Sequence, residues 1–316
     1  MAIHRPAAGR ARSTWTPRTR QRFITGMGFI SLWIVGFIVF TLYPMIASLA
    51  YSFTEYHIKQ PSEWLGILNY TKLIQDPLFW KSLYNTAYMV VFAVPLSLLF
   101  SFLCALLLNI KTPGQSIYRV IYFLPSIVPV VASTLLWLWI LNPNSGLLNT
   151  LLDGIGIRGP NWTKDPFWAK PSLIMLGLWG VGNTIIIYLA GLQDIPDTLV
   201  EAAELDGASW WQRLWSITIP LISPITLFNL IIGVIGTFQY FSQAYVLSAG
   251  ISPVASGLGA PLNSTLFYSV YLYQQGFVYL KMGYASAQAW ILFLIILVCT
   301  LLLLRSSDTW TYYEGG

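Results

Sequence analysis

Long apolar stretches without charge are the feature of this sequence that most restricts its fold. Phe23 to Thr54 is one such run, Ser82 to Ile110 is another, and the 67 residues from Leu214 to Leu280 contain no acid or base. About 20 apolar residues cross a bilayer as a helix. Only 9% of the residues are charged and the mean hydropathy is +0.63, whereas soluble domains carry about 25% charged residues. The sequence therefore predicts an all-α, polytopic membrane protein.

The basic residues indicate how the chain enters the membrane. Six of the seventeen bases lie in residues 5–22, directly before the first apolar run, so the net charge of +5 is a topology signal and not a sign of nucleic-acid binding. The first run is also longer than the 7 to 15 apolar residues of a signal peptide. With Lys111 and Arg119 marking a short inner loop, both termini are expected in the cytoplasm. The expected spans are Thr25–Phe53, Ser82–Ile110, a third that follows Arg119 and ends before the loop at 142, Pro171–Gln193, Pro220–Leu247 and Ser286–Leu304, with external loops at 55–81 and 142–171.

The long uncharged stretch needs a division, since 67 residues of helix would measure roughly 100 Å and exceed one span. Glycines and prolines between Gly250 and Pro261 interrupt it. The segment 263–281 that follows is aromatic and polar, which favours an external helix at the membrane interface. A seventh span there is the alternative that we reject.

One densely charged stretch separates the apolar runs. From Asp194 to Arg213 there are five acids and one base. Pro196 ends the preceding segment, and Thr198 with Glu201 forms the pattern of a capping box, which predicts that a short helix begins here. Gly207 then permits a sharp turn into a second, tryptophan-rich helix. Capping and periodicity alone fit an ordinary amphipathic surface helix equally well.

The order of residues in this stretch is more specific. E-A-A at 201–203, L-D-G-A at 205–208 and I-T-I-P-L at 217–221 resemble the cytoplasmic coupling signature of inner-membrane subunits of binding-protein-dependent ABC importers. The resemblance implies that the loop 194–219 docks into a groove of a separate ATPase. In that loop Glu201 would face basic residues and Gly207 would permit the turn. The implied coupling residues are Glu201, Ala202, Ala203, Asp206 and Gly207.

A second motif indicates which group of importers the sequence resembles. Tyr118-Arg119, then F-L-P at 123–125, a second proline at 129 and G-L-L-N at 146–149 are similar to the first of two permeases in carbohydrate importers of the maltose and glycerol-phosphate type. This implies the type I ABC importer permease fold, with six transmembrane helices and a cytoplasmic helix-turn-helix coupling loop. The corresponding organisation is a basic cytoplasmic segment 1–22, a permease domain 23–305 and a cytoplasmic tail 306–316.

The resemblance also implies partners. These are a second, homologous permease, a dimer of ATPase subunits, an extracytoplasmic solute-binding protein and a sugar, all at the inner membrane. The 316 residues contain no GxxxxGK[ST] motif, so ATP and Mg²⁺ are expected on the ATPase and no cofactor on this chain.

Polar residues within the spans are candidates for the solute path. Asn183 beside Trp179 suits a hydroxylated ring, although an interhelical hydrogen bond explains Asn183 equally well. The family resemblance maps the midplane site onto Ser126, Trp179, Gly180, Asn183, Gly233, Gly236 and Thr237. Several of these are glycines, which leave room for a solute but have no side chain to bond it. How many of the solute contacts the partner permease supplies therefore stays open.

Two other classes of function fit less well. An ion-coupled secondary transporter predicts acids or bases inside the spans, and the predicted spans have none. A membrane enzyme predicts a cluster of catalytic side chains, and the pattern shows no such spacing. Cys104 and Cys299 lie in apolar runs and are expected to be buried hydrophobes, and His57 is expected to be a solvated loop residue. The sequence does not identify the sugar.

Overall fold

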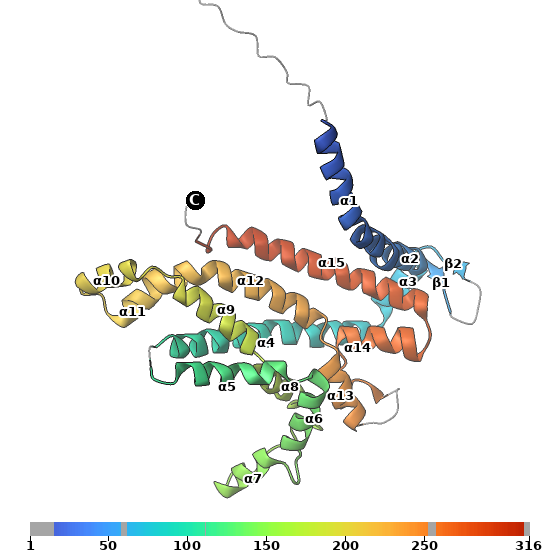
Figure 1. The fold of residues 1–316 in the computed structure, drawn as a ribbon. Helices are drawn as coiled ribbons and strands as arrows, with labels where there is room; N and C mark the ends of the chain where they lie inside the picture. Colours follow the sequence, from blue (N-terminus) through green and yellow to red (C-terminus); the bar gives the residue numbers. More distant parts are fainter. Residues whose placement is uncertain (1–15, 58–61, 111, 252–256, 313–316) are drawn as a thin grey trace, which may run out of the picture. The chain divides into compact units, whose positions relative to one another are not determined.

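The computed structural model describes residues 16–57, 62–110, 112–251 and 257–312 (Figure 1). These residues are mostly helical, as predicted, with one antiparallel pair of short strands, β1 (Thr54–Glu55) and β2 (Glu63–Trp64). The chain divides into two units, residues 1–50 and 51–316. The helices are α1 (Pro17–Phe37), α2 (Tyr43–Ser52), α3 (Leu68–Gln75), α4 (Pro77–Asn109), α5 (Gln115–Ile127), α6 (Val130–Ile140), α7 (Leu147–Gly154), α8 (Ala169–Trp179), α9 (Gly182–Gln193), α10 (Asp197–Leu205), α11 (Trp210–Arg213), α12 (Ile219–Phe238), α13 (Ser242–Ile251), α14 (Tyr268–Tyr273) and α15 (Met282–Ser307).

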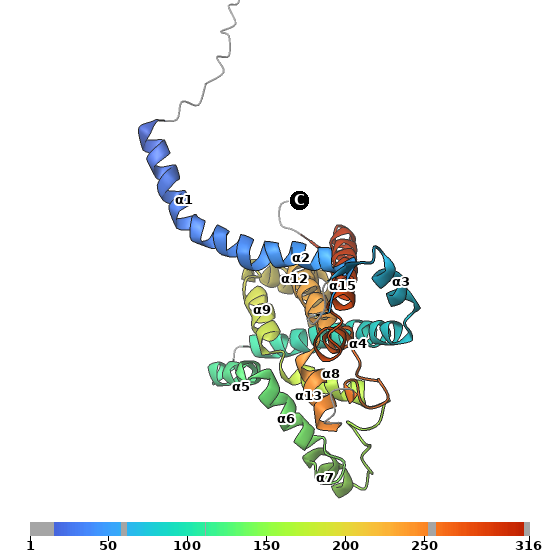
Figure 2. The same cartoon turned by 90° about the vertical axis from the view of Figure 1, so that its right-hand side faces the viewer.

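The first apolar run forms one helix from Pro17 to Ser52. Thr16 caps its start, since the Thr16 hydroxyl accepts a hydrogen bond from the Thr19 amide at 3.3 Å. A π-helical turn at Ile38–Leu42 lies directly before Pro44, and the helix curves there (Figure 2). Proline lacks the N–H that continues the helical ladder, which accounts for a bend at this point. The basic residues at 5, 10 and 12 and Lys111 lie outside the described residues.

The membrane-spanning helices agree with the predicted number. Four helices among the described residues are long and apolar enough to cross a bilayer, and two bent helix pairs bring the number to six when each pair counts as one span. The single helices are Pro17–Ser52, Pro77–Asn109, Trp210–Gly250 and Met282–Ser307, and the pairs are α5 with α6 and α8 with α9.

Both bent pairs break where the local sequence disfavours a helix. The axes of α5 and α6 differ by 98°, and the break falls at Val128, which is extended, and Pro129. A residue before proline is pushed out of the helical region, which explains the extended Val128. Pro125, by contrast, stays within α5. The axes of α8 and α9 differ by 51°, with the break at Gly180.

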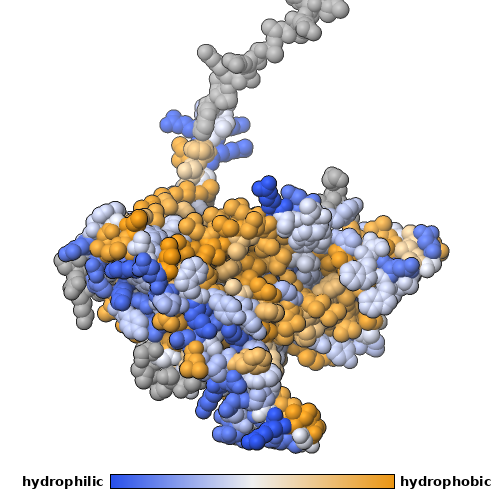
Figure 3. Space-filling model, turned by 180° about the vertical axis from the view of Figure 1, so that it is seen from behind, coloured by the Kyte–Doolittle hydropathy of each residue, from blue (hydrophilic) through white to orange (hydrophobic). Residues whose placement is uncertain are grey.

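Helix α4 lies at the centre of the second unit, packed against α9 and α12, while α15 packs beside α12. The helices approach closely where side chains are small: a Cβ on Gly191 would overlap Ile225, and one on Gly233 would lie 3.1 Å from Val94. Cys104 is buried in this core and both cysteines are free thiols. A broad apolar face covers the bundle between more hydrophilic regions (Figure 3), which fits a surface in contact with lipid.

The segment 263–281 differs from its prediction. It forms the short helix α14 and a π-helical turn at Gln274–Val278, and most of these residues are buried against α4 and α15. The Thr86 hydroxyl on α4 accepts a hydrogen bond from the Tyr268 amide at 2.9 Å, and the Tyr268 phenol donates to the Gln288 carbonyl of α15 at 2.8 Å. The segment is therefore not an amphipathic surface helix, and it is too short to be a seventh span.

Candidate functional site

The acidic loop connects α9 to α12 and forms two short helices at one end of the bundle (Figure 1). Helix α10 carries Asp197, Glu201 and Glu204, all of which are exposed. Two leucines on the same helix are also exposed, Leu205 to 90% and Leu199 to 43%. A helix that presents acids beside large apolar side chains has the composition of a docking surface.

The turn between α10 and α11 depends on Gly207. Its φ angle is +79°, in the left-handed region, and no atom lies within 4 Å of the position that a Cβ would occupy. The Gly207 amide donates to the Glu204 carbonyl at 3.0 Å and the Ala208 amide donates to the Ala203 carbonyl at 2.9 Å. These two bonds form a Schellman motif, which closes the last turn of α10. The predicted helix, turn and second helix are confirmed.

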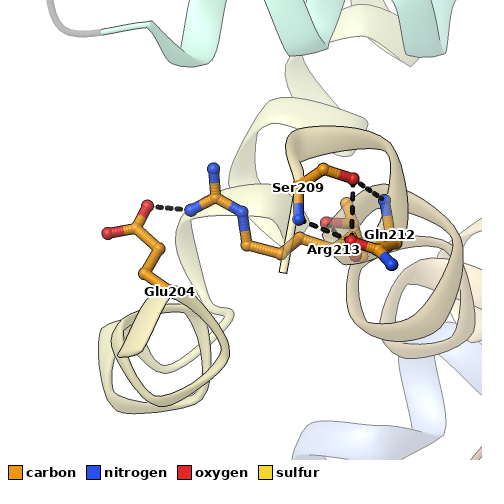
Figure 4. Close-up of polar contacts among 5 residues, drawn as sticks. Glu204, Ser209, Gln212 and Arg213 are labelled. Atoms are coloured by element: carbon orange, nitrogen blue, oxygen red, sulfur yellow. Dashed lines mark hydrogen bonds and ion pairs between the residues drawn. The ribbon is translucent and has the colours of Figure 1, made fainter. Parts of the chain in front are cut away.

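The predicted capping box is wrong in its position. Pro196 precedes α10 as the N-cap residue, and no side chain caps that helix, so Thr198 and Glu201 do not form the box. The box caps α11 instead (Figure 4): the Gln212 side chain accepts a hydrogen bond from the Ser209 amide at 2.7 Å, and the Ser209 hydroxyl accepts one from the Gln212 amide. Helix α10 thus begins before Thr198, and Glu201 is exposed on it.

One ion pair spans the turn. The Arg213 guanidinium on α11 pairs with the Glu204 carboxylate on α10 (Figure 4). Within the described residues, the other ion pair joins His57 to Glu55, so Glu201 has no cationic partner there. Asp206, the C-cap residue of α10, is exposed, as is Ala202, and Ala203 is half-buried. Among the predicted coupling residues, Glu201 and Asp206 are therefore exposed acids without a cationic partner in the described part of the chain.

The second arm of the loop continues into the membrane. Helix α11 passes through a π-helical turn at Leu214–Thr218 directly into α12, and the turn lies just before Pro220. Trp210, Trp211 and Trp215 are exposed on this arm. Exposed tryptophans at a helix entry are typical of the membrane interface.

The predicted path residues fall into two groups. Ser126 on α5 lies against the start of α9: a Cβ on Gly182 would lie 3.1 Å from the Ser126 hydroxyl and 2.8 Å from the Tyr122 carbonyl. Trp179 ends α8, Gly180 lies at the break, and Asn183 lies in the first turn of α9, close in sequence to Gly182. Asn183 is exposed, and none of the hydrogen bonds of the described residues involves its amide. The structure thus brings these four residues to one region.

The other three predicted residues lie on α12. Gly233 contacts Val94 of α4 and acts as a packing residue, whereas Gly236 is exposed to open space and Thr237 is half-buried. Cavities of 240 to 570 Å³ on the described part of the chain are lined by other residues, at the two ends of the bundle. None of these four cavities is lined by any of the seven residues.

Sequence reasoning missed a set of polar contacts at the end of the bundle opposite to the loop. Asp76 caps α4 and accepts hydrogen bonds from the phenols of Tyr271 and of Tyr284, the latter at 2.8 Å. Lys170 on α8 donates to the buried Asn85 at 3.0 Å. The Asp-Pro step at 76–77 signals the cap, but nothing local signals partners some 200 residues away. Among the described residues, no group of three or more His, Cys, Asp or Glu side chains is arranged to hold a metal ion.

Comparison with known proteins gives consistent matches. The family described as "Binding-protein-dependent transport system inner membrane component" matches residues 80–311. The probable ABC transporter permease protein YesP of Bacillus subtilis is 41% identical over 94% of both chains. The lactose transport system permease protein LacF of Rhizobium radiobacter is 34% identical, covering 88% of this chain and 92% of LacF. The arabinooligosaccharides transport system permease protein AraP of Bacillus subtilis is 30% identical, covering 97% and 96%.

Solved structures show the same fold. A chain of the bacterial alginate ABC transporter, in complex with an alginate pentasaccharide-bound periplasmic protein, superposes with a TM-score of 0.76 at 24% identity and covers 95% of this chain and 99% of that chain. A second structure, of a bacterial ABC transporter that imports the acidic polysaccharide alginate, gives a TM-score of 0.74 at 25% identity over 92% and 100%.

Proposed function

Because the chain belongs to the family of inner membrane components of binding-protein-dependent transport systems, we propose that it is a permease subunit of an ATP-binding-cassette importer that carries a sugar across the cytoplasmic membrane. Relatives named for lactose and for arabinooligosaccharides support the sugar. The partners in this proposal are a second permease, two ATPase subunits that bind ATP and Mg²⁺, and an extracytoplasmic solute-binding protein.

The observation that carries the proposal is the position of the acidic loop between two membrane helices. At one side, three residues separate α9 from α10; at the other, α11 runs through a π-helical turn into α12 without a break. Helix α9 begins beside Asn183 and α12 ends beside Thr237. From Trp210 to Thr237 the helix is roughly 40 Å long, at 1.5 Å per residue. A displacement of the loop is therefore transmitted along two helices to the candidate path residues.

The chemistry of the loop suits a basic groove on the ATPase. Glu204 is already paired with Arg213, whereas Glu201 and Asp206, like Asp194 and Asp197, are exposed acids free to meet an external cation. Transport requires that ATP and solute each prefer one arrangement of the permease. In this account the docked ATPases with ATP favour the outward-facing arrangement, and hydrolysis restores the inward-facing one.

The orientation follows from the bases. Ten lie on the side of the N-terminus in the predicted topology and seven on the other side, and this bias supports a cytoplasmic position for the loop and both termini. The domain boundaries proposed are 1–22 for the basic segment, 23–305 for the permease domain and 306–316 for the tail. In the described part of this tail, the Tyr312 amide donates to the Ser223 hydroxyl at 2.9 Å and so packs back onto α12.

Reconstitution tests the proposal. The test uses vesicles that contain this chain, its partner permease, the ATPase and the solute-binding protein. They are expected to accumulate sugar only when ATP is supplied on the side of the membrane where the ATPase is bound. Omission of the ATPase is expected to abolish accumulation. Accumulation by this chain alone, driven by a proton or sodium gradient, would instead identify an ion-coupled secondary transporter.

A further inference from the structure

A polar cavity of about 410 Å³ lies at the end of the bundle opposite to the coupling loop. Four elements form its walls: the strand β1 with the residues that follow it, α3, the segment from α14 to the π-helical turn, and the start of α15. Its volume falls within the range of small-molecule sites, which is about 300 to 1,000 Å³. Its lining is Thr54, Glu55, Tyr56, His57, Leu65, Asn69, Lys72, Asp76, Tyr271, Gln275, Lys281, Gly283 and Tyr284.

The walls are held together by specific contacts. The Gly283 amide donates to the Tyr56 carbonyl at 3.1 Å, and Gly283 leaves no room for a side chain, since a Cβ there would lie 2.1 Å from the Thr54 carbonyl oxygen. The buried Asn69 side chain donates to the Ser52 and Thr54 carbonyls, both at 2.9 Å. A cavity with fixed walls is preorganised for a ligand.

The inner part of the cavity offers hydrogen-bond acceptors and phenols. Asp76 accepts from Tyr271 and Tyr284, and burial together with the adjacent carboxylate raises the pKa of the Tyr271 phenol, so that the phenol keeps its proton at neutral pH. Gln275 is only 7% exposed, and its side-chain oxygen has no hydrogen-bond partner. A buried amide oxygen without a donor is costly, and a ligand hydroxyl supplies one.

The rim of the cavity offers hydrogen-bond donors, and the positive and negative charges of its lining balance. Lys72 and Lys281 are exposed at the rim, and within the described residues neither has a carboxylate within 4.0 Å. The acids are Asp76 and Glu55, and Glu55 is paired with His57 at 3.7 Å. Two lysines and two carboxylates leave little net charge. A site with acceptors inside, donors at the rim and three tyrosine rings suits a neutral molecule whose hydroxyls both donate and accept.

We infer that this cavity binds a neutral sugar or polyol, as a second solute site separate from the residues around Asn183. The choice of a sugar rests on the proposed function, which places this end outside the membrane, where the solute-binding protein delivers its cargo. The site then holds solute at the entrance of the permease.

Equilibrium dialysis tests the inference. The complete transporter in nanodiscs, without the solute-binding protein, is titrated with labelled lactose, L-arabinose, mannitol and galacturonate. At least one neutral probe is expected to bind saturably. Gln275→Met, which keeps the length of the side chain, is expected to weaken that binding by three- to tenfold. Gln274→Met is the matched control, because Gln274 is equally buried but bonds to Tyr279 outside the cavity.

Three outcomes would overturn the inference: no probe binds, galacturonate binds in preference, or Gln275→Met binds as the wild type does. The proposed function is judged separately by ATP-driven uptake into vesicles. Uptake without binding at the cavity contradicts only the second site, whereas binding without ATP-driven uptake contradicts the proposed function.

Discussion

Arg213 and Glu204 pair across the turn that reverses the acidic loop, nine residues apart in sequence. The pair ties α11 to α10, so the two short helices form one unit with the turn between them. Glu204 is thereby neutralised, and Glu201, one helical turn earlier, is left as an exposed acid. Exposed ion pairs contribute only about 0 to 1 kcal/mol. The rigidity of the loop therefore depends mainly on its backbone, at Gly207 and Ser209.

Replacement of Gly207 by valine is expected to distort the turn. A β-branched residue in the left-handed conformation costs about 1–2 kcal/mol, while the site itself has room for a side chain. We expect Gly207→Val to reduce co-purification of the ATPase several-fold. Gly207→Asn is the control, since asparagine adopts this conformation more readily, and it should retain most of the complex. A normal complex with valine would show that docking does not depend on this turn.

The observed position of the capping box predicts different effects for two substitutions that look alike in sequence. Ser209→Ala removes the cap of α11 and should destabilise that arm by about 1 kcal/mol, seen as faster hydrogen exchange of the amides at 210–214. Thr198→Ala removes a hydroxyl that caps no helix and should leave exchange in α10 unchanged. Faster exchange in α10 after Thr198→Ala would contradict the observed cap.

These results show which features local sequence specifies. The apolar runs predicted the spans, and Gly207 predicted the turn, because both depend on residues that are neighbours in the chain. The capping box was misplaced because the Thr198 pattern requires Thr198 as the N-cap residue, whereas the N-cap of α10 is Pro196. The burial of α14 was missed because it depends on Thr86 and Gln288, which are distant in sequence. The predicted path residues line none of the four cavities described above, so they stay candidates from sequence reasoning.

The hydrogen bond from Tyr271 to Asp76 should make stability depend on pH in the alkaline range. Burial raises the pKa of Tyr271 above the value of about 10 for a free tyrosine, so the unfolded state loses its proton first as the pH rises. The stability contributed by this phenol is complete below about pH 10 and is lost above it. At pH 8, Tyr271→Phe should lower the free energy of unfolding by about 1.5–3 kcal/mol. In nanodiscs the difference in unfolding temperature should narrow at pH 10.5, and a constant difference would contradict the assignment.

Asn183 is the path residue whose substitution tests the solute route most simply. Its amide is exposed and has no partner in the described chain, so Asn183→Leu should leave assembly with the second permease and the ATPase unchanged. Uptake should fall several-fold, since a solute hydroxyl loses its partner. Trp179→Leu is a second variant for the same uptake assay, since it removes the aromatic ring adjacent to Asn183. An unchanged uptake rate and unchanged preference among sugars would remove Asn183 from the path.

The central claim is that ATP turnover on a separate subunit drives this chain through its acidic loop, and Glu201→Lys tests it most directly. The measurement is ATP-driven sugar uptake into vesicles that contain the complete transporter, with Glu201→Gln as a milder variant and the amount of membrane-inserted chain determined in parallel. We predict that Glu201→Lys abolishes uptake while the protein remains inserted, because a base replaces the exposed acid that faces the basic groove. Wild-type uptake by Glu201→Lys would contradict the account.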